Sequence, residues 1–178
     1  MANQLGQAFL DASIKRLGEY KQMADLAINQ LDESQLFKTL AIGSNSILII
    51  MQHMAGNMLS RWTNFLSEDG EKPWRDRDQE FEPVFKDKAS IAAYWEKGWG
   101  CLLDTLSSLY PTDLEKQIQI RGEGLKVQDA IIRQLMHYSS HVGQIIYLSK
   151  MLKGADWQPL TIDKNKSKDY NLSLGYEQ

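Results

Sequence analysis

The sequence predicts an all-α protein, a four-helix bundle with a long loop between the second and third helices and a short hairpin before the fourth. Four segments of about 20 or more residues carry apolar side chains at spacings close to the period of an amphipathic α-helix. The 178 residues are 43% hydrophobic and 24% charged, as is usual for a soluble domain. We therefore expect a single domain over residues 1–178, with a core of about residues 3–154.

The first two helical segments cover residues 3–31 and residues 44–67. In each, the apolar residues recur every three to five positions and form one stripe. The second segment opens with Ser44 or Ser46 as its expected N-cap. A serine side chain there accepts a hydrogen bond from an amide of the first turn, which has no partner within the helix.

The last two helical segments have clearer ends. The third, about residues 90–109, is expected to begin at Ser90 and to stop before Pro111, because proline cannot continue a helix. The fourth covers about residues 127–153 and is followed by Gly154. Glycine favours the left-handed conformation that often ends a helix, so this boundary is well marked.

The loop between the second and third helices spans residues 67–90 and shows no sustained period. Loops of this length are usually functional or disordered. We expect a partly ordered excursion over the surface, anchored by Trp74, Phe81 and Phe85. The stretch "WRDRDQE", residues 74–80, alternates in charge and is typical of a solvated, self-paired surface.

A short hairpin is expected just before the last helix. In "KQIQIRGEGLKV", Ile118 and Ile120 alternate with polar residues and precede a turn that contains glycine. Residues 155–178 are polar and are expected to form a C-terminal tail.

Composition argues against several classes of protein. The formal net charge is −3 and no block of like charges is long, so no nucleic-acid partner is expected. The longest strongly apolar run, Ile47 to Met51, is far too short to span a membrane. The single cysteine, Cys101, forms no internal disulfide, and the first residues lack the pattern of a secretion signal. We expect a soluble, cytoplasmic protein.

Two of the three histidines lie in the fourth helical segment. His137 and His141 differ by about 40° around an ideal helix, so they stack one turn apart. Both belong to the apolar stripe or its near edge and are expected to face the interior of the bundle. In the second segment, Met58 lies near the centre of the apolar stripe. The third histidine, His53, is about 140° away from Met58 around the helix. Periodicity alone does not direct His53 towards the other two.

Three imidazoles arranged in this way can bind one divalent metal ion. Nitrogen–metal distances of about 2.0–2.1 Å are within reach when helices pack about 8–10 Å apart. The motif "HYSSH" lacks the glutamate of the H-E-x-x-H metalloproteases, which excludes that class. Three neutral ligands would leave a position open for substrate or water, as in catalytic sites. The other interpretation is that each histidine is a hydrogen-bonded core residue.

Three stretches of the sequence resemble a known family. The helix "HMAGNMLSRW" followed far downstream by "H-x-x-x-H-V-G-Q" resembles the DinB-like superfamily, also called DinB/YfiT-like. More closely, "GEKPWRDRD" and "HYSSHVGQI" are similar to its subfamily known as domain of unknown function 1572. The resemblance covers about residues 5–155. It implies a four-helix bundle with a three-histidine metal site.

The resemblance also carries functional expectations. It places the metal ligands at His53, His137 and His141, and Gln144 matches a glutamine common in the last helix of the family. It implies a divalent transition metal, often nickel, zinc, iron or manganese, and frequently a homodimer. Relatives include bacillithiol transferases and a mycothiol-dependent maleylpyruvate isomerase, in which the metal activates a low-molecular-weight thiol.

Two functional hypotheses follow. The first is a metal-dependent enzyme that activates a low-molecular-weight thiol or water for transfer to, or hydrolysis of, a small-molecule substrate. The second is a non-catalytic module that binds a ligand or a protein, with the metal stabilising the fold. Asn57, Arg61 and Gln144 are candidates to orient the ligands or to bind substrate. For Arg61 the alternative is a pairing with an acidic side chain.

Overall fold

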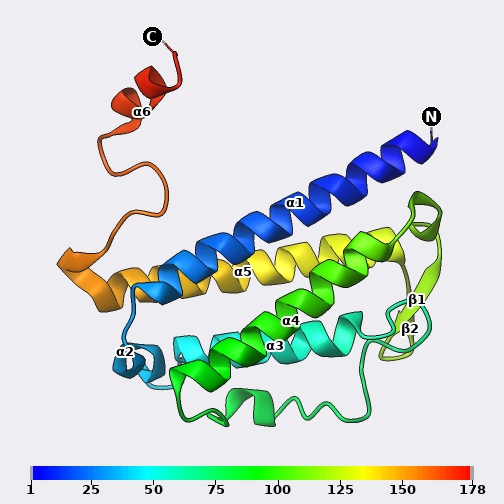
Figure 1. Ribbon diagram of the computed structural model, residues 1–178. Coiled ribbons are helices and arrows are strands. Elements are labelled where there is room, and N and C mark those ends of the chain that lie inside the picture. Colours follow the sequence, from blue (N-terminus) through cyan, green and yellow to red (C-terminus); the bar gives the residue numbers. More distant parts are fainter. Residues whose placement is uncertain (1, 177–178) are drawn as a thin grey trace.

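The computed structural model describes residues 2–176, and most of this range is helical (Figure 1). The helices are α1 (Ala2–Asn29), α2 (Glu33–Phe37), α3 (Ile47–Trp62), α4 (Lys88–Ser108), α5 (Val127–Lys153) and α6 (Ser167–Ser173). The strands are β1 (Gln117–Ile120) and β2 (Glu123–Lys126), and the short 3-10 turns are η1 (Gln79–Phe81), η2 (Pro111–Asp113) and η3 (Gly154–Asp156). The protein is thus mostly helical with a small two-stranded sheet, as predicted.

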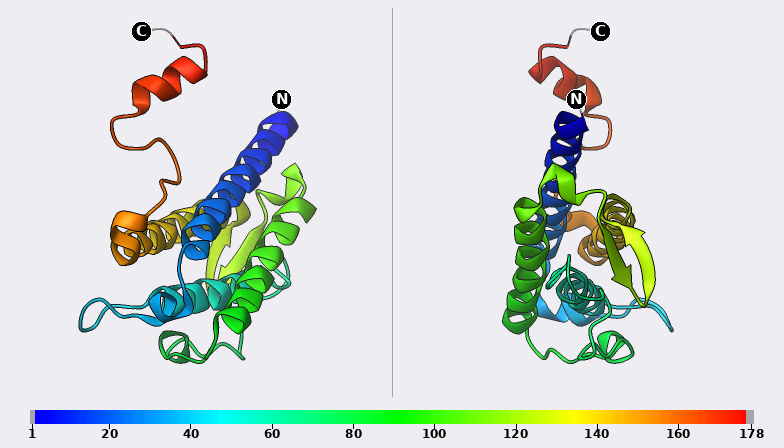
Figure 2. Two further views of the ribbon diagram at one scale, coloured as in Figure 1. Left: turned by 60° about the vertical axis from the view of Figure 1, so that its left-hand side comes forward. Right: turned by 90° about the vertical axis from the view of Figure 1, so that its right-hand side faces the viewer.

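The four long helices pack around one core (Figures 1 and 2). Helix α1 lies against α5 and α4, and α3 lies against α4 and α5. Each helix contributes fully buried apolar side chains, for example Leu17, Met54, Trp99 and Val142. Within residues 2–176 none of the helices has both the length and the hydrophobicity of a membrane span.

Side-chain caps fix where the helices begin. Ser46 is the N-cap of α3, since its Oγ accepts a hydrogen bond of 3.3 Å from the Ile49 amide. The cap of α4 is Asp87, which accepts a 2.7 Å bond from the Ser90 amide. The expected start of this helix at Ser90 was therefore wrong by two residues. Helix α5 ends as predicted, with Gly154 in the C-cap position at φ 56°.

Two of the predicted helices are shorter than expected. The first helix was predicted over residues 3–31, but α1 ends two residues earlier, at Asn29, and the short α2 that follows was not predicted. A capping box starts α2: Asp32 Oδ1 accepts from the Gln35 amide at 2.8 Å, and Gln35 Oε1 accepts from the Asp32 amide at 3.1 Å. Helix α3 stops at Trp62, well before residue 67.

Helix α3 is buried on nearly every side, with only Leu59 of its residues partly exposed. On one side α4 comes very close: a Cβ on Gly98 would lie 2.8 Å from the Cα of Ala55. Glycine at position 98 therefore allows the two helix backbones to touch. On another side the chain that follows α3 folds back along it, which removes this helix almost completely from water.

The predicted hairpin is confirmed. Strand β1 pairs antiparallel with β2, with Ile118 opposite Leu125. Arg121 and Gly122 form the turn with φ of 57° and 75°, and two successive positive φ values suit the twist of a two-residue hairpin turn. Strand β2 runs directly into α5, so the hairpin sets the start of the helix that carries His137 and His141.

The chain between α3 and α4, residues 63–87, is called here the connecting segment (Figure 1). Polar contacts attach its first part to the hairpin. Asp69 accepts hydrogen bonds from the amides of Arg121 and Gly122 at 2.8 and 2.7 Å. The Gly70 amide donates to the Gln119 carbonyl at 2.8 Å.

The aromatic anchors expected for this segment are only partly present. Trp74 is 59% exposed and Phe81 is 44% exposed, so neither anchors the segment in the core. Phe85 is half-buried and packs on Tyr94, with ring centroids 5.0 Å apart. Polar side chains hold most of the segment instead, because its backbone lies over a helix and needs hydrogen-bond partners.

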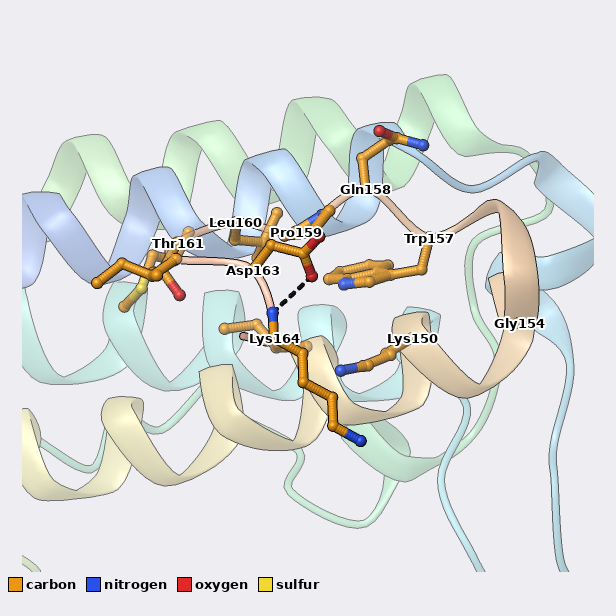
Figure 3. Close-up of a pocket in the computed structure, with 12 residues that line it drawn as sticks. Lys150, Gly154, Trp157, Gln158, Pro159, Leu160, Thr161, Asp163 and Lys164 are labelled. Carbon is orange, nitrogen blue, oxygen red and sulfur yellow. Dashed lines mark hydrogen bonds between the residues drawn. The ribbon is translucent and has the colours of Figure 1, made fainter. Parts of the chain in front are cut away.

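Part of the predicted C-terminal tail, residues 155–178, packs on the helices. Trp157 and Leu160 contact the core, and the side-chain amide of Gln30 forms two hydrogen bonds with the backbone of Gln158, of 2.8 and 3.0 Å. A pocket of about 660 Å³ lies between this segment, α1 and α5 (Figure 3). Helix α6 projects away from the long helices (Figures 1 and 2).

Candidate metal centre

His53 lies in the middle of α3 and is 6% exposed. It is buried because the connecting segment covers the side of α3 on which it lies. One ring nitrogen, Nε2, is turned towards α5, and the other, Nδ1, is turned towards the connecting segment. The position of His53 relative to the other histidines, which periodicity alone left open, is thereby defined.

His137 and His141 lie one turn apart on α5, as the spacing predicted. Both are half-buried, and their ring centroids are 4.7 Å apart with the rings nearly perpendicular. The ring of His53 contacts both from α3, at centroid distances of 5.4 and 5.0 Å. Two helices therefore bring all three imidazoles to one place.

The Nε2 atoms are the atoms that converge. His137 Nε2 lies 3.4 Å from His53 Nε2 and 3.1 Å from His141 Nε2. One nitrogen from each of the three histidines lies within 4.8 Å of the others. Among residues 2–176 this cluster includes no cysteine and no carboxylate.

The hydrogen-bond partners of Nδ1 indicate the tautomer of two of the three imidazoles, His53 and His141. His53 Nδ1 is 2.9 Å from Glu80 Oε2, and an ionised carboxylate only accepts hydrogen bonds. His141 Nδ1 likewise donates to Gln144 Oε1 at 2.9 Å. In the neutral form of each ring, a proton on Nδ1 leaves the lone pair on Nε2, the atom that faces the other histidines.

This arrangement fits a divalent transition metal ion. For nitrogen–metal bonds of about 2.0–2.1 Å in tetrahedral geometry, two ligand nitrogens lie about 3.3–3.4 Å apart, which is close to both measured Nε2 separations. Without a cation, three lone-pair nitrogens would face one another with at most one proton to share. Three histidine ligands leave at least one coordination position for another molecule.

Without metal, the imidazoles of His137 and His141 are poor bases. Burial, together with the neighbouring His141 and His53, lowers the pKa of His137 to about 3. Burial also lowers the pKa of His141, although the hydrogen bond with Gln144 acts in the opposite direction. Both groups are therefore neutral at physiological pH, which is the form that binds metal.

A family model described as a protein of unknown function, DUF1572, matches residues 4–166. The chain belongs to the DUF1572 family. The match includes all three histidines and the whole connecting segment, and it ends just before α6. The chain matches none of the curated proteins and none of the solved structures significantly.

In this DUF1572 protein, Asn57 lies one turn from His53 and is buried. Its Oδ1 accepts a 3.0 Å hydrogen bond from the Tyr138 hydroxyl, which in turn accepts a 3.1 Å bond from Trp62 Nε1. Tyr138 is the neighbour of His137 on α5. The first of these two hydrogen bonds therefore joins α3 to α5 within about one helical turn of His53 and His137 along each helix.

Arg61 is also buried, and its guanidinium contacts the Glu71 carboxylate, with both Nη atoms 3.2 Å from Oε2. It also donates to the Gly70 carbonyl. The pairing with an acidic residue, which was the alternative for Arg61, is thus present. Gln144 is exposed, and its Oε1 lies 2.9 Å from His141 Nδ1.

Sequence reasoning missed Glu80, although it lies directly beside His53. The carboxylate is held by Arg75, whose Nε and Nη2 donate to its two oxygens at 2.7 and 2.8 Å. Burial alone would raise the pKa of Glu80, but the hydrogen bonds from His53 and Arg75 bring it below its usual value. The stretch "WRDRDQE" was interpreted as solvated and self-paired; Arg75 and Glu80 do pair with each other, but for these two the expected solvation was wrong.

A signal for Glu80 was present in α3. Gln52, directly before His53, is a buried polar residue in a stretch of α3 that is apolar from Ile47 to Met51, and such a residue needs buried partners. Its Nε2 lies within 3.0 Å of the carbonyls of Gln79, Glu80 and Glu82, and its Oε1 accepts from the Val84 amide at 3.2 Å. Gln52 thus marks the place where the connecting segment meets α3.

Proposed function

We propose that this protein is a metal-dependent enzyme of the DinB/YfiT-like superfamily, a four-helix bundle in which His53, His137 and His141 bind a divalent transition metal ion. Nickel, zinc, iron and manganese are the candidates. The observation that supports the proposal is the convergence of three Nε2 atoms, two of them with Nδ1 held by a hydrogen-bond acceptor.

The bound cation would supply Lewis acidity that favours the deprotonated form of a low-molecular-weight thiol or of water. The residues of the chain then have separate tasks. The three histidines remain uncharged, so the ligand set does not neutralise the cation. Gln144 and Glu80 hold two of the rings in orientation. Transfer of the thiol to a small electrophile, or hydrolysis of a small substrate, is the proposed reaction class.

The first test is metal analysis of protein purified without a histidine tag. We expect about one divalent transition metal ion per chain, lost in His53→Ala and in His141→Ala. A matched control is Cys101→Ser, because Cys101 lies outside the cluster and should leave the metal content unchanged. Bound metal in the histidine variants equal to that of the wild type would refute the shared site.

Added metal should also stabilise the native protein. Binding at 100 times the dissociation constant contributes about 2.7 kcal/mol. For a chain of this length this corresponds to roughly 5–11 °C in Tm. Screens with low-molecular-weight thiols and model electrophiles, and with hydrolysable substrates, then test catalysis. Metal binding without turnover in any of these screens would favour the non-catalytic module.

The proposed setting is the cytoplasm, with a homodimer as the expected assembly. Light scattering on the metal-loaded protein measures the assembly directly. The metal site uses residues of one chain, so the metal content per chain is expected to be the same in monomer and dimer.

A further inference from the structure

We propose that Glu80 is a positioning residue of the metal centre, held in place by Arg75 and fixing the ring of His53 so that Nε2 faces the other two histidines. This inference rests on the proposed metal-binding function and extends it to a residue that lies outside the ligand set. The connecting segment is then part of the metal centre as well as a cover for α3.

The hydrogen-bond geometry gives Glu80 a single orientation. Glu80 Oε2 accepts from His53 Nδ1 at 2.9 Å and from Arg75 Nη2 at 2.8 Å, and Oε1 accepts from Arg75 Nε at 2.7 Å. The forked contact with the guanidinium prevents rotation of the carboxylate. The carboxylate in turn fixes both the tautomer and the rotation of the His53 ring, as carboxylates do beside metal-binding histidines.

Glu80 cannot close the metal site as a fourth ligand in this arrangement. It contacts His53 at Nδ1, whereas the metal would bind at Nε2 on the other edge of the same ring. Phe81 stacks on the His53 ring with centroids 4.9 Å apart and an interplanar angle of 26°. The two consecutive residues of η1 thus hold the ring from its edge and from its face.

The surface of α3 is shaped to receive this carboxylate. Gly56 lies one turn from His53, and a Cβ at this position would be 2.5 Å from Glu80 Oε1. Because a real side chain cannot come that close, position 56 needs glycine if Glu80 is to stay where it is. Gln52, one residue before His53, holds the backbone on both sides of Glu80.

The stability of the fold alone does not explain why Arg75 and Glu80 form a buried ion pair. The side chains of Arg75 and Glu80 are 2% and 9% exposed. Removing two charges from water costs several kcal/mol per ion, and buried pairs are often no better than apolar residues of similar volume. The position of the pair against a candidate metal ligand supplies the functional reason. Arg75 also offsets the charge of Glu80, so the carboxylate orients His53 without neutralising a bound cation.

The test compares Glu80→Gln and Glu80→Ala with the wild type in a competition between protein and a chromogenic chelator for Zn²⁺ or Ni²⁺. We expect affinity to fall about 10–100-fold in Glu80→Ala, the usual effect of losing such a partner. Glu80→Gln should be intermediate, because its amide oxygen can still accept from His53 while its amide group faces Arg75 donors.

Gly56→Ala displaces the Glu80 carboxylate without changing its chemistry. It should therefore weaken metal binding, as Glu80→Ala does. The matched control is Gly18→Ala in α1, where an added Cβ would have no neighbour within 4 Å. This control should bind metal like the wild type.

Nitrogen NMR of the metal-free protein gives a second readout that does not depend on metal. We expect His53 to carry its proton on Nδ1 in the wild type and to become a mixture of tautomers in Glu80→Ala. Urea unfolding of the metal-free variants separates the roles. A purely structural Glu80 would lower the free energy of unfolding yet leave the metal affinity of the folded protein and the His53 tautomer unchanged, which would overturn the inference.

The outcomes for the two proposals are distinguishable. A wild-type protein that binds no transition metal would overturn the proposed function and this inference with it. A wild-type protein that binds metal through the three histidines, with equal affinity in the Glu80 and Gly56 variants, would overturn the inference alone.

Discussion

Replacement of Gly98 by alanine tests the close contact that places α3, and with it His53, against α4. The new Cβ would lie 2.8 Å from the Cα and 3.0 Å from the Cβ of Ala55. Carbon atoms normally pack at about 3.5–4.0 Å, so the helices would have to separate by roughly 1 Å at this point. Overpacking costs about 1–3 kcal/mol, and a contact with backbone atoms belongs near the upper end because they cannot rotate away.

Alanine also favours a helix over glycine by up to about 1 kcal/mol, which opposes this cost. We therefore expect Gly98→Ala to lower the free energy of unfolding by about 2 kcal/mol, or roughly 4–8 °C in Tm. Gly100→Ala is the matched control, two residues along the same helix, where an added Cβ meets nothing within 4 Å. It should be neutral or stabilising by up to about 1 kcal/mol.

Urea unfolding of both variants, without metal, measures the difference directly. The contact with Ala55 also lies two residues from His53, so a shift of α3 should change the 3.4 Å separation between His53 Nε2 and His137 Nε2. Metal affinity should fall in Gly98→Ala and not in Gly100→Ala. Equal free energies of unfolding for the two variants, within about 0.5 kcal/mol, would refute the argument from packing.

Two further predictions concern Tyr138 and His137. Tyr138→Phe leaves Trp62 Nε1 and Asn57 Oδ1 without their partner in a buried place, so urea unfolding should show a loss of roughly 2–4 kcal/mol; a loss below about 0.5 kcal/mol would contradict it. In metal-free protein, the pKa of His137 is about 3 when folded, against about 6.5 in an unfolded chain. The contribution of His137 to the free energy of unfolding is greatest above about pH 6.5. It decreases as the pH falls towards 3, because in this range only the unfolded chain takes up the proton. His137→Gln should show a flatter pH dependence of unfolding in that range.

The sequence predicted best those elements whose ends carry local signals. The bounds of α5 and the hairpin agree with expectation, because Gly154 and the glycine-containing turn at Arg121 and Gly122 act within a few residues. The end of α1 was predicted two residues too late, because Leu31 keeps the apolar spacing beyond Asn29, and the short α2 with its capping box was not predicted.

There is a physical reason why hydrophobic periodicity could not predict the direction in which the His53 side chain points. A hydrophobic stripe shows which side of a helix faces the core only if the opposite side is exposed to water. In α3 the residues from Ile47 to Met58 are all buried, so the stripe has no polar side to define it. The resemblance to the DinB-like proteins supplied the missing direction, and the 3.4 Å approach of His53 to His137 agrees with it.

The reason why α3 is buried all round also explains why Glu80 was missed. The connecting segment covers the outer side of α3, and the same segment carries Glu80 to His53. The charged residues of the connecting segment suggest that it is exposed. Arg75 and Glu80 nevertheless form an ion pair with each other and can therefore be buried. Deleting the segment would expose the apolar side of α3 and remove Glu80 at once, so it could not separate the stability of the fold from the geometry of the site. Single substitutions at Glu80 and Gly56 leave the cover in place and can separate them.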